Sequence, residues 1–159
     1  MRIHLITVGK LKEKYLRQAC EEYLKRLQSY AKVEITEVTE EKSQDPVSPT
    51  EIHLILDKEG ERIAKAMHAD TYLIALAIDG KSLSSIDFAK KLDQLTTYGK
   101  SHITFVIGGS YGLSSSILER ADMKLSFSAM TFPHQLIRVF LLEQIYRACK
   151  INRGETYHK

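Results

Sequence analysis

Metal-binding cysteine motifs are absent from this sequence. It contains only two cysteines, Cys20 and Cys149, and neither belongs to a Cys-x-x-Cys pair or lies at a cysteine–histidine spacing that could hold zinc. We expect both to be reduced thiols in the core or at an interface. Four histidines also lack a companion at ligand spacing, and we predict surface or packing roles and no metal site for them: His4, His53, His68 and His102.

Long apolar runs are absent as well. No stretch approaches the roughly 20 apolar residues of a membrane span, and the amino terminus lacks the apolar core and cleavage site of a signal peptide. We therefore expect a cytoplasmic protein with no membrane contact. The 159 residues are 43% hydrophobic and 27% charged, show no internal repeat, and suit one globular domain spanning residues 1–159.

The net charge of +3 is concentrated at the carboxyl end of the chain. Basic and acidic side chains balance over residues 1–146, so the segment after them carries the whole excess. Basic residues interleaved with aromatic rings could grip a phosphate backbone and stack a base. The alternative is a frayed, solvated helix end, where Lys and Arg are favoured in any case. The residues that would contact RNA are Arg147, Lys150, Arg153, Tyr157, His158 and Lys159.

Strand and helix patterns alternate along the chain. Strands are predicted over residues 2–8, 32–39, 71–78, 102–108 and 123–128, and helices over about 10–29, 49–67, 84–98, 114–121 and 133–150. The run 71–78 is apolar throughout, as in a parallel strand that is covered on both faces. This order predicts an α/β fold with a mostly parallel sheet flanked by helices.

The predicted helix 49–67 begins with a capping sequence and carries a group of carboxylates. Ser48 is placed as N-cap, with Pro49 at the first helical position and Glu51 as the capping-box partner. Further along, the acidic residues Asp57, Glu59 and Glu61 resemble paired carboxylates for acid–base chemistry. Their i, i+2, i+4 spacing and their lysine neighbours instead predict a solvated helix face.

A glycine-rich segment, IGGSYGLSSS at residues 107–116, follows one of the buried strands. Its glycines match neither Gly-x-Gly-x-x-Gly nor the phosphate-loop pattern. Either the chain turns there, with Ser114 capping the next helix, or a ligand approaches the backbone closely. Because ligands bind outside the carboxyl ends of parallel strands, the loops after Ile78, Ile107 and Phe127 could wall one pocket. The first strand is followed by GKLKEKY, which does not fit a nucleotide-dependent oxidoreductase.

The last predicted helix is apolar on two sides. Leu136, Ile137, Phe140, Leu141 and Ile145 form one stripe, and a second stripe contains Val139, Leu142 and Tyr146. A helix that is apolar on both sides should be buried on both sides. The sheet can cover one stripe and an identical subunit the other, so we predict a symmetric homodimer.

Several motifs together resemble a known family. They are LITVGK near the amino terminus, ILDKEGE at residues 55–61, IGGSYGLS, LSFSAMTFPHQLIRVFLLEQIYRA and the closing YHK. Over essentially the whole chain the sequence is similar to the ribosomal RNA large subunit methyltransferase H family, which are SPOUT-class enzymes. The resemblance implies an α/β fold with a C-terminal trefoil knot.

The resemblance also implies a reaction and a set of contacts. The methyl donor would be S-adenosylmethionine, and the product an N3-methylated pseudouridine in the 23S rRNA of assembled ribosomes. Ser110 and Tyr111 are given no ligand role. Carried over to this sequence, the residues that bind the cofactor would be Leu76, Gly108, Phe127, Ser128, Ala129, Met130, Thr131 and Phe132.

Methylation at N3 requires that a proton leave the base, so a general base or a group that stabilises the developing anion would help. We predict that Tyr157 and His158 play this part by closing over the partner subunit's cofactor. His134 and Arg138 are further catalytic candidates. His134 could instead cap its helix, and Arg138 could form an interface ion pair or contact RNA phosphate. A ribosome-binding factor without catalytic activity would also explain the basic tail.

Overall fold

Five parallel strands form one sheet in the computed structural model, which describes residues 1–45 and 47–159. The strand order across the sheet is β2-β1-β4-β3-β5, and every registered pair of neighbours is parallel. The predicted α/β class is therefore confirmed. The strands are β1 (Arg2–Val8), β2 (Lys32–Val38), β3 (Tyr72–Ser82), β4 (His102–Ile107) and β5 (Met123–Ser126). The helices are α1 (Lys14–Leu27), α2 (Pro49–Ala66), α3 (Ser85–Thr97), α4 (Ser115–Arg120) and α5 (His134–Asn152).

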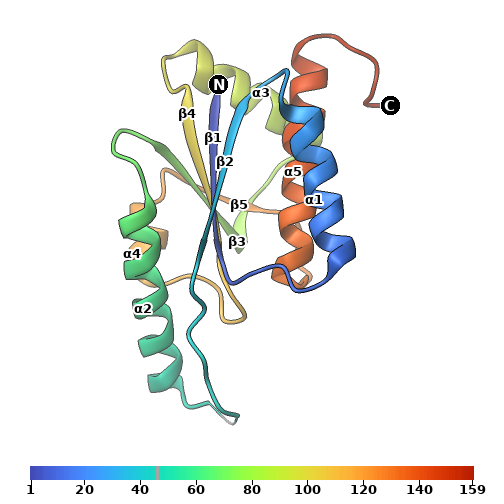
Figure 1. The fold of residues 1–159 in the computed structure, drawn as a ribbon. Helices are drawn as coiled ribbons and strands as arrows, with labels where there is room; N and C mark the ends of the chain where they lie inside the picture. Colours follow the sequence, from blue (N-terminus) through green and yellow to red (C-terminus); the bar gives the residue numbers. More distant parts are fainter. Residues whose placement is uncertain (46) are drawn as a thin grey trace.

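Helices cover both faces of the sheet, as Figure 1 shows. The larger core lies between the sheet and helices α1, α3 and α5, and includes Phe88, Phe105 and Leu141. A smaller core lies between the other face and helices α2 and α4, and includes Ile63, Val106 and Ile117. Residues 103–107 of β4 are all buried, because this strand is central in the sheet and has a helical layer on each side.

The capping signals of the sequence are confirmed. The Ser48 hydroxyl accepts a hydrogen bond from the backbone N–H of Glu51, and Ser114 does the same for Ile117. Helix α1 begins four residues later than expected, at Lys14. Both cysteines are free and buried in the larger core, as predicted, and burial raises the pKa of each thiol.

Strand β3 continues four residues past the predicted end at Ile78. Its second half pairs with β5 in a shifted register, so that Leu76 and Lys81 both lie opposite Leu125. The crossing is tight at Gly80, where a Cβ atom would lie within 2.9 Å of the backbone of Lys124 and Leu125. A glycine is therefore required at this position.

Helix α5 is largely covered on both sides within a single subunit, although Phe140 of its first stripe is 42% exposed. Leu142 of its second apolar stripe is fully buried, and the Tyr146 ring packs on Tyr23 of α1 and on Tyr30, with ring centroids 6.4 and 5.9 Å apart. The reason given above for a homodimer is therefore wrong, since α1 covers the stripe that was assigned to a partner. The homodimer and the trefoil knot both stay predictions.

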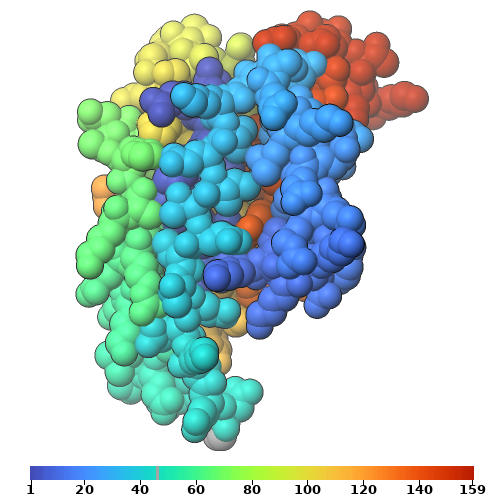
Figure 2. All heavy atoms as spheres, in the orientation of Figure 1, coloured from blue at the N-terminus to red at the C-terminus, as the bar shows by residue number. Residues whose placement is uncertain are grey.

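Figure 2 shows that the first turns of α2 extend beyond the rest of the molecule. They do so at the end of the sheet where β1 and β2 finish (Figure 1). Among the residues described, none of the helices is long and apolar enough to cross a membrane.

Candidate functional site

A cavity of about 770 Å³ lies at the carboxyl ends of β3, β4 and β5. Its walls are the loops after β4 and β5 and residues 76–79 of β3, a segment that was predicted from the sequence to leave the strand as a loop after Ile78. Its volume lies within the usual range for small-molecule sites, and the position is the one at which open parallel sheets bind ligands. The lining residues are Leu76–Asp79, Ile107–Leu113, Leu118, Leu125, Phe127, Ser128, Met130–His134 and Ile137.

Seven of the eight residues expected to bind the cofactor line this cavity together. They are Leu76, Gly108, Phe127, Ser128, Met130, Thr131 and Phe132. The eighth, Ala129, is exposed and is not among the lining residues. These seven come from three segments that are far apart in the sequence, and the sheet topology brings them to one edge.

The glycine-rich loop holds its shape through contacts with itself. Gly109 and Gly112 form an isolated antiparallel bridge, and Gly112 has a φ of +89°, a conformation that side chains rarely adopt. A Cβ atom on Gly108 would overlap the backbone carbonyl of Gly112. The turn itself therefore requires Gly108, and the expectation that a ligand approaches this glycine stays a prediction.

Carboxylates lie directly behind the glycine-rich loop. A Cβ atom on Gly109 would come within 3.6 Å of a Glu40 oxygen and 3.7 Å of a Glu59 oxygen. Glu59 is buried, accepts the backbone N–H of Glu41 at 2.9 Å, and has its pKa raised mainly by burial. The prediction of a solvated helix face holds for Asp57 and Glu61 but is wrong for Glu59.

The loop after β5 forms the opposite wall and is shaped by its serines. The Ser126 hydroxyl donates to the carbonyl of Ser128 at 3.1 Å, and the Ser128 hydroxyl accepts the N–H of Met130 at 2.9 Å. These bonds fix a turn that leaves the Met130 side chain 73% exposed at the mouth of the cavity. Beyond Phe132 a second cavity of about 240 Å³ extends toward α3 and the Phe140 side chain.

His134 lines the cavity at the start of α5. Pro133 is the N-cap residue and no side chain caps this helix, so the alternative that His134 acts as a cap is wrong. The imidazole is partly exposed. A titratable ring that faces the cavity fits the catalytic expectation for His134 in position.

Arg138 points away from the cavity, toward the ends of β1 and β2. Its guanidinium donates to Glu37 at 2.8 Å, to the Thr7 hydroxyl at 2.8 Å and to the carbonyl of Gly9 at 3.3 Å. The side chain is only 7% exposed. Both alternatives for Arg138, an ion pair between subunits and a contact with RNA phosphate, are replaced by an ion pair inside the subunit.

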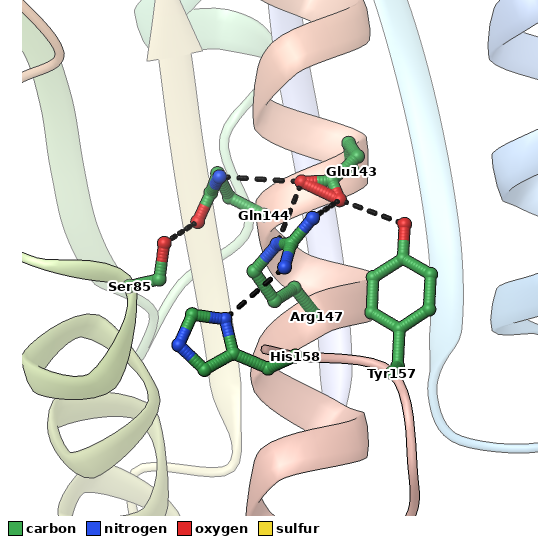
Figure 3. A network of polar contacts seen from close by, with 6 residues as sticks. All are labelled: Ser85, Glu143, Gln144, Arg147, Tyr157 and His158. Carbon is green, nitrogen blue, oxygen red and sulfur yellow. Dashed lines mark hydrogen bonds and ion pairs between the residues drawn. The ribbon is translucent and has the colours of Figure 1, made fainter.

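The carboxyl-terminal tail folds back on α5 (Figure 3). Figure 3 shows the carboxylate of Glu143 between Arg147 and Tyr157: it accepts from the Arg147 Nε at 3.1 Å and from the Tyr157 hydroxyl at 2.9 Å. Arg147 also lies 3.1 Å from Nδ1 of His158. Burial and this carboxylate raise the pKa of Tyr157 to about 12. The alternative of a frayed helix end is therefore wrong.

Two more basic residues at this end contact tyrosine rings. The Arg153 guanidinium lies 4.5 Å from the ring centroid of Tyr30, and Lys150 lies 5.4 Å from the same centroid and 3.4 Å from a Glu155 oxygen. Lys159 is exposed. None of the residues predicted to contact RNA lines the cavity of its own subunit within the part of the chain that the structure describes.

Sequence reasoning missed three polar residues of the cavity wall: Asp79, Ser110 and Tyr111. The signal for Asp79 was its place next to Gly80 at the end of a buried strand. Ser110 and Tyr111 were given no ligand role because they lie between the glycines, yet the turn directs this segment to the cavity. Their hydroxyls lie 3.5 Å from Glu40 and Ser43, respectively.

Three of the histidines predicted to lack companions lie together. One ring nitrogen of each of His4, His68 and His102 falls within 4.8 Å of the others. The prediction that these three histidines lack companions is therefore wrong, because residues far apart in sequence meet where β1, β4 and the segment before β3 adjoin. His53 is exposed on α2, as expected.

Comparisons with known proteins agree with this architecture. Residues 1–158 match a family model described as predicted SPOUT methyltransferase. The chain is 57% identical over its whole length to ribosomal RNA large subunit methyltransferase H of Bacillus thuringiensis (strain Al Hakam), and 58% identical to the protein of that name from Bacillus cytotoxicus; each alignment covers all of both chains.

Two solved structures share the fold at low sequence identity. A probable methyltransferase from Bordetella pertussis Tohama I matches with a TM-score of 0.59 and 14% identity, over 93% of this chain and 94% of that one. A probable methylase family protein from Haemophilus influenzae Rd KW20 matches with a TM-score of 0.53 and 13% identity, over 96% of this chain and 66% of that one.

Proposed function

Because this chain belongs to the ribosomal RNA large subunit methyltransferase H family of SPOUT methyltransferases, we propose that it methylates a base of large-subunit rRNA with S-adenosylmethionine as methyl donor. The observation that carries the proposal is the convergence of seven expected cofactor residues on one cavity. The relatives' names support an rRNA substrate, and the cavity supports our assignment of the donor to this edge of the sheet.

The residues of the cavity suit this donor chemically. Leu76, Phe127 and Phe132 provide apolar walls for a flat base, and the backbone groups of the two loops can read its edge. Asp79 offers a carboxylate at the cavity wall that can pair with a positive charge or with sugar hydroxyls. When bound, the donor supplies a methyl group that its sulfonium sulfur has already activated.

We further propose that the target atom is N3 of a pseudouridine in 23S rRNA of assembled ribosomes. The protein must then hold the base in line with the methyl group, exclude water, and accept or share the N3 proton. His134 is the titratable ring on the cavity wall and is placed to take part. Tyr157 and His158 remain candidates through the tail.

The position of the tail supports action in a dimer. Helix α5 begins at the cavity with His134 and ends at Asn152, roughly 28 Å further along its axis. The tail folds back only as far as Glu143, so it does not reach the cavity of its own subunit. If Tyr157 and His158 act in the reaction, they act at the cavity of a second copy. Exposed apolar side chains near the two cavities offer a surface for that copy: Ile86, Met130 and Phe140.

RNA contact is assigned to the same end of the molecule. Arg147, Lys150, Arg153 and Lys159 give it a positive charge, and tyrosine rings contact the first three of these side chains. Such a small footprint suits a target that is recognised partly by the shape of an assembled particle.

Calorimetric titration with S-adenosylmethionine, S-adenosylhomocysteine and NAD tests the donor assignment. The proposal expects binding of the first two and not of NAD; binding of NAD alone, or of none of them, contradicts it. Methyl transfer is then measured on ribosomes from a strain that lacks the enzyme, with mass spectrometry of the rRNA to locate the product. Donor binding without methyl transfer to ribosomes or free rRNA would contradict the rRNA assignment.

A further inference from the structure

We propose that His4, His68 and His102, together with the carboxylate of Glu34, form a binding site for a zinc-like divalent transition-metal ion. The four residues come from different segments: His4 from β1, Glu34 from β2, His102 from the first position of β4, and His68 from the turn between α2 and β3. This site goes beyond methyl transfer. It lies at the amino edge of the sheet, whereas the cavity lies at the carboxyl edge, about 17 Å further along β4.

The donor atoms are already gathered. One nitrogen of each imidazole lies within 4.8 Å of the others, and His68 is placed between the other two, with ring centroids 4.9 Å from His4 and 5.2 Å from His102. The Glu34 carboxylate lies 2.9 Å from Nε2 of His68 and 3.7 Å from Nε2 of His4. Three imidazoles and one carboxylate are a set of ligands that zinc accepts in tetrahedral sites.

His4 carries the second observation. This side chain is 1% exposed, and its Nδ1 has no hydrogen-bond partner among the described residues. A buried polar atom without a partner is costly and rare. The other ring nitrogen, Nε2, lies 2.8 Å from the Thr36 hydroxyl. Histidines that bind metals commonly donate their second ring N–H in this way, which would leave Nδ1 as the His4 nitrogen that is free to bind an ion.

The site needs a modest contraction to bind an ion. Ligand atoms about 2.0–2.1 Å from a tetrahedral zinc lie roughly 3.4 Å from one another. The three ring nitrogens in this structure lie within 4.8 Å of one another, so they would have to move closer together. His68 can supply this movement, because it is exposed and lies in a turn that contains Asp70 at a φ of +58°. With four protein ligands the ion would have a structural role, joining three strands to the turn before β3.

The test uses the full-length protein without a histidine tag. Equilibrium dialysis against Zn²⁺, with elemental analysis, measures how many ions bind per chain and how tightly, and Co²⁺ reports the geometry through its visible absorption. The matched variants are His68→Ala, which removes an exposed ligand without opening the core, and His53→Ala, which removes an exposed histidine outside the cluster.

We expect one tightly bound ion per chain in the wild type and in His53→Ala, and a tetrahedral Co²⁺ spectrum from both. We expect His68→Ala to lose affinity by at least ~10-fold, the lower end of the cost of changing even an outer-shell group. Its affinity for S-adenosylmethionine should not change. The proposal is overturned if the wild type binds no stoichiometric Zn²⁺, or if His68→Ala binds it as tightly as His53→Ala does.

Discussion

The ion pair between Arg138 and Glu37 is expected to be one of the larger polar contributions to stability, and Glu37→Gln tests it. The Arg138 side chain is 7% exposed and that of Glu37 is 35% exposed. Without the carboxylate, a buried guanidinium keeps only neutral acceptors, which are the amide oxygen at position 37, the Thr7 hydroxyl and the Gly9 carbonyl. Breaking a buried pair costs about 3–5 kcal/mol, and we expect about 3 kcal/mol because water reaches Glu37. In a chain of this size that lowers Tm by roughly 6–12 °C.

Removing the arginine instead of the carboxylate should lower the free energy of unfolding by less. Arg138→Met leaves a carboxylate that can turn into water, so we expect a loss of about 1–2 kcal/mol, and the double variant should be more stable than Glu37→Gln alone. Urea denaturation with matched m-values measures each free energy of unfolding. Glu22→Gln is the control, because the Arg26–Glu22 pair is exposed and solvent screening leaves it little effect on stability. If Glu37→Gln costs no more than this control, the reasoning about the buried arginine is refuted.

Three further predictions concern the cavity and the tail. Gly108→Ala should weaken binding of S-adenosylhomocysteine by about ten-fold or more in calorimetry, because the new methyl group would displace the Gly112 carbonyl and reshape the loop; unchanged affinity would separate this turn from donor binding. Removal of residues 156–159 should leave donor affinity unchanged yet abolish methyl transfer to ribosomes, and normal transfer by the truncated protein would exclude the tail from the reaction. In a spectrophotometric pH titration, Tyr157 should ionise near pH 12, and Glu143→Gln should lower the pKa of Tyr157. Because the folded state favours the neutral phenol, the free energy of unfolding should fall as the pH rises from about 10 to about 12. A Tyr157 that ionises near pH 10 would contradict the network in Figure 3.

Local signals in the sequence predicted the elements well. Ser48 and Ser114 cap the helices that they were expected to cap, since capping depends only on residues within one turn. The unbroken apolar run of β3 indicated a buried parallel strand. Its extension through polar residues to Ser82 could not be predicted, because that part of the strand forms by pairing with β5, more than 40 residues later.

Features that depend on tertiary packing were the ones missed. Glu59 looked solvent-exposed, but α2 packs so closely on α4 at Gly60 that a Cβ atom there would collide with Ser114, and the neighbouring carboxylate is buried. The second stripe of α5 indicated a partner subunit, although α1 covers it. The histidine cluster was invisible for the same reason, since His4 and His102 meet only when their strands pair.

The central claim is that β3 and the loops after β4 and β5 hold the methyl donor, and a crystal structure with S-adenosylhomocysteine bound tests it most directly. The account predicts electron density for the ligand in the cavity between Leu76, the Gly108 loop and Phe132. Density for the ligand at any other place on the protein would contradict it.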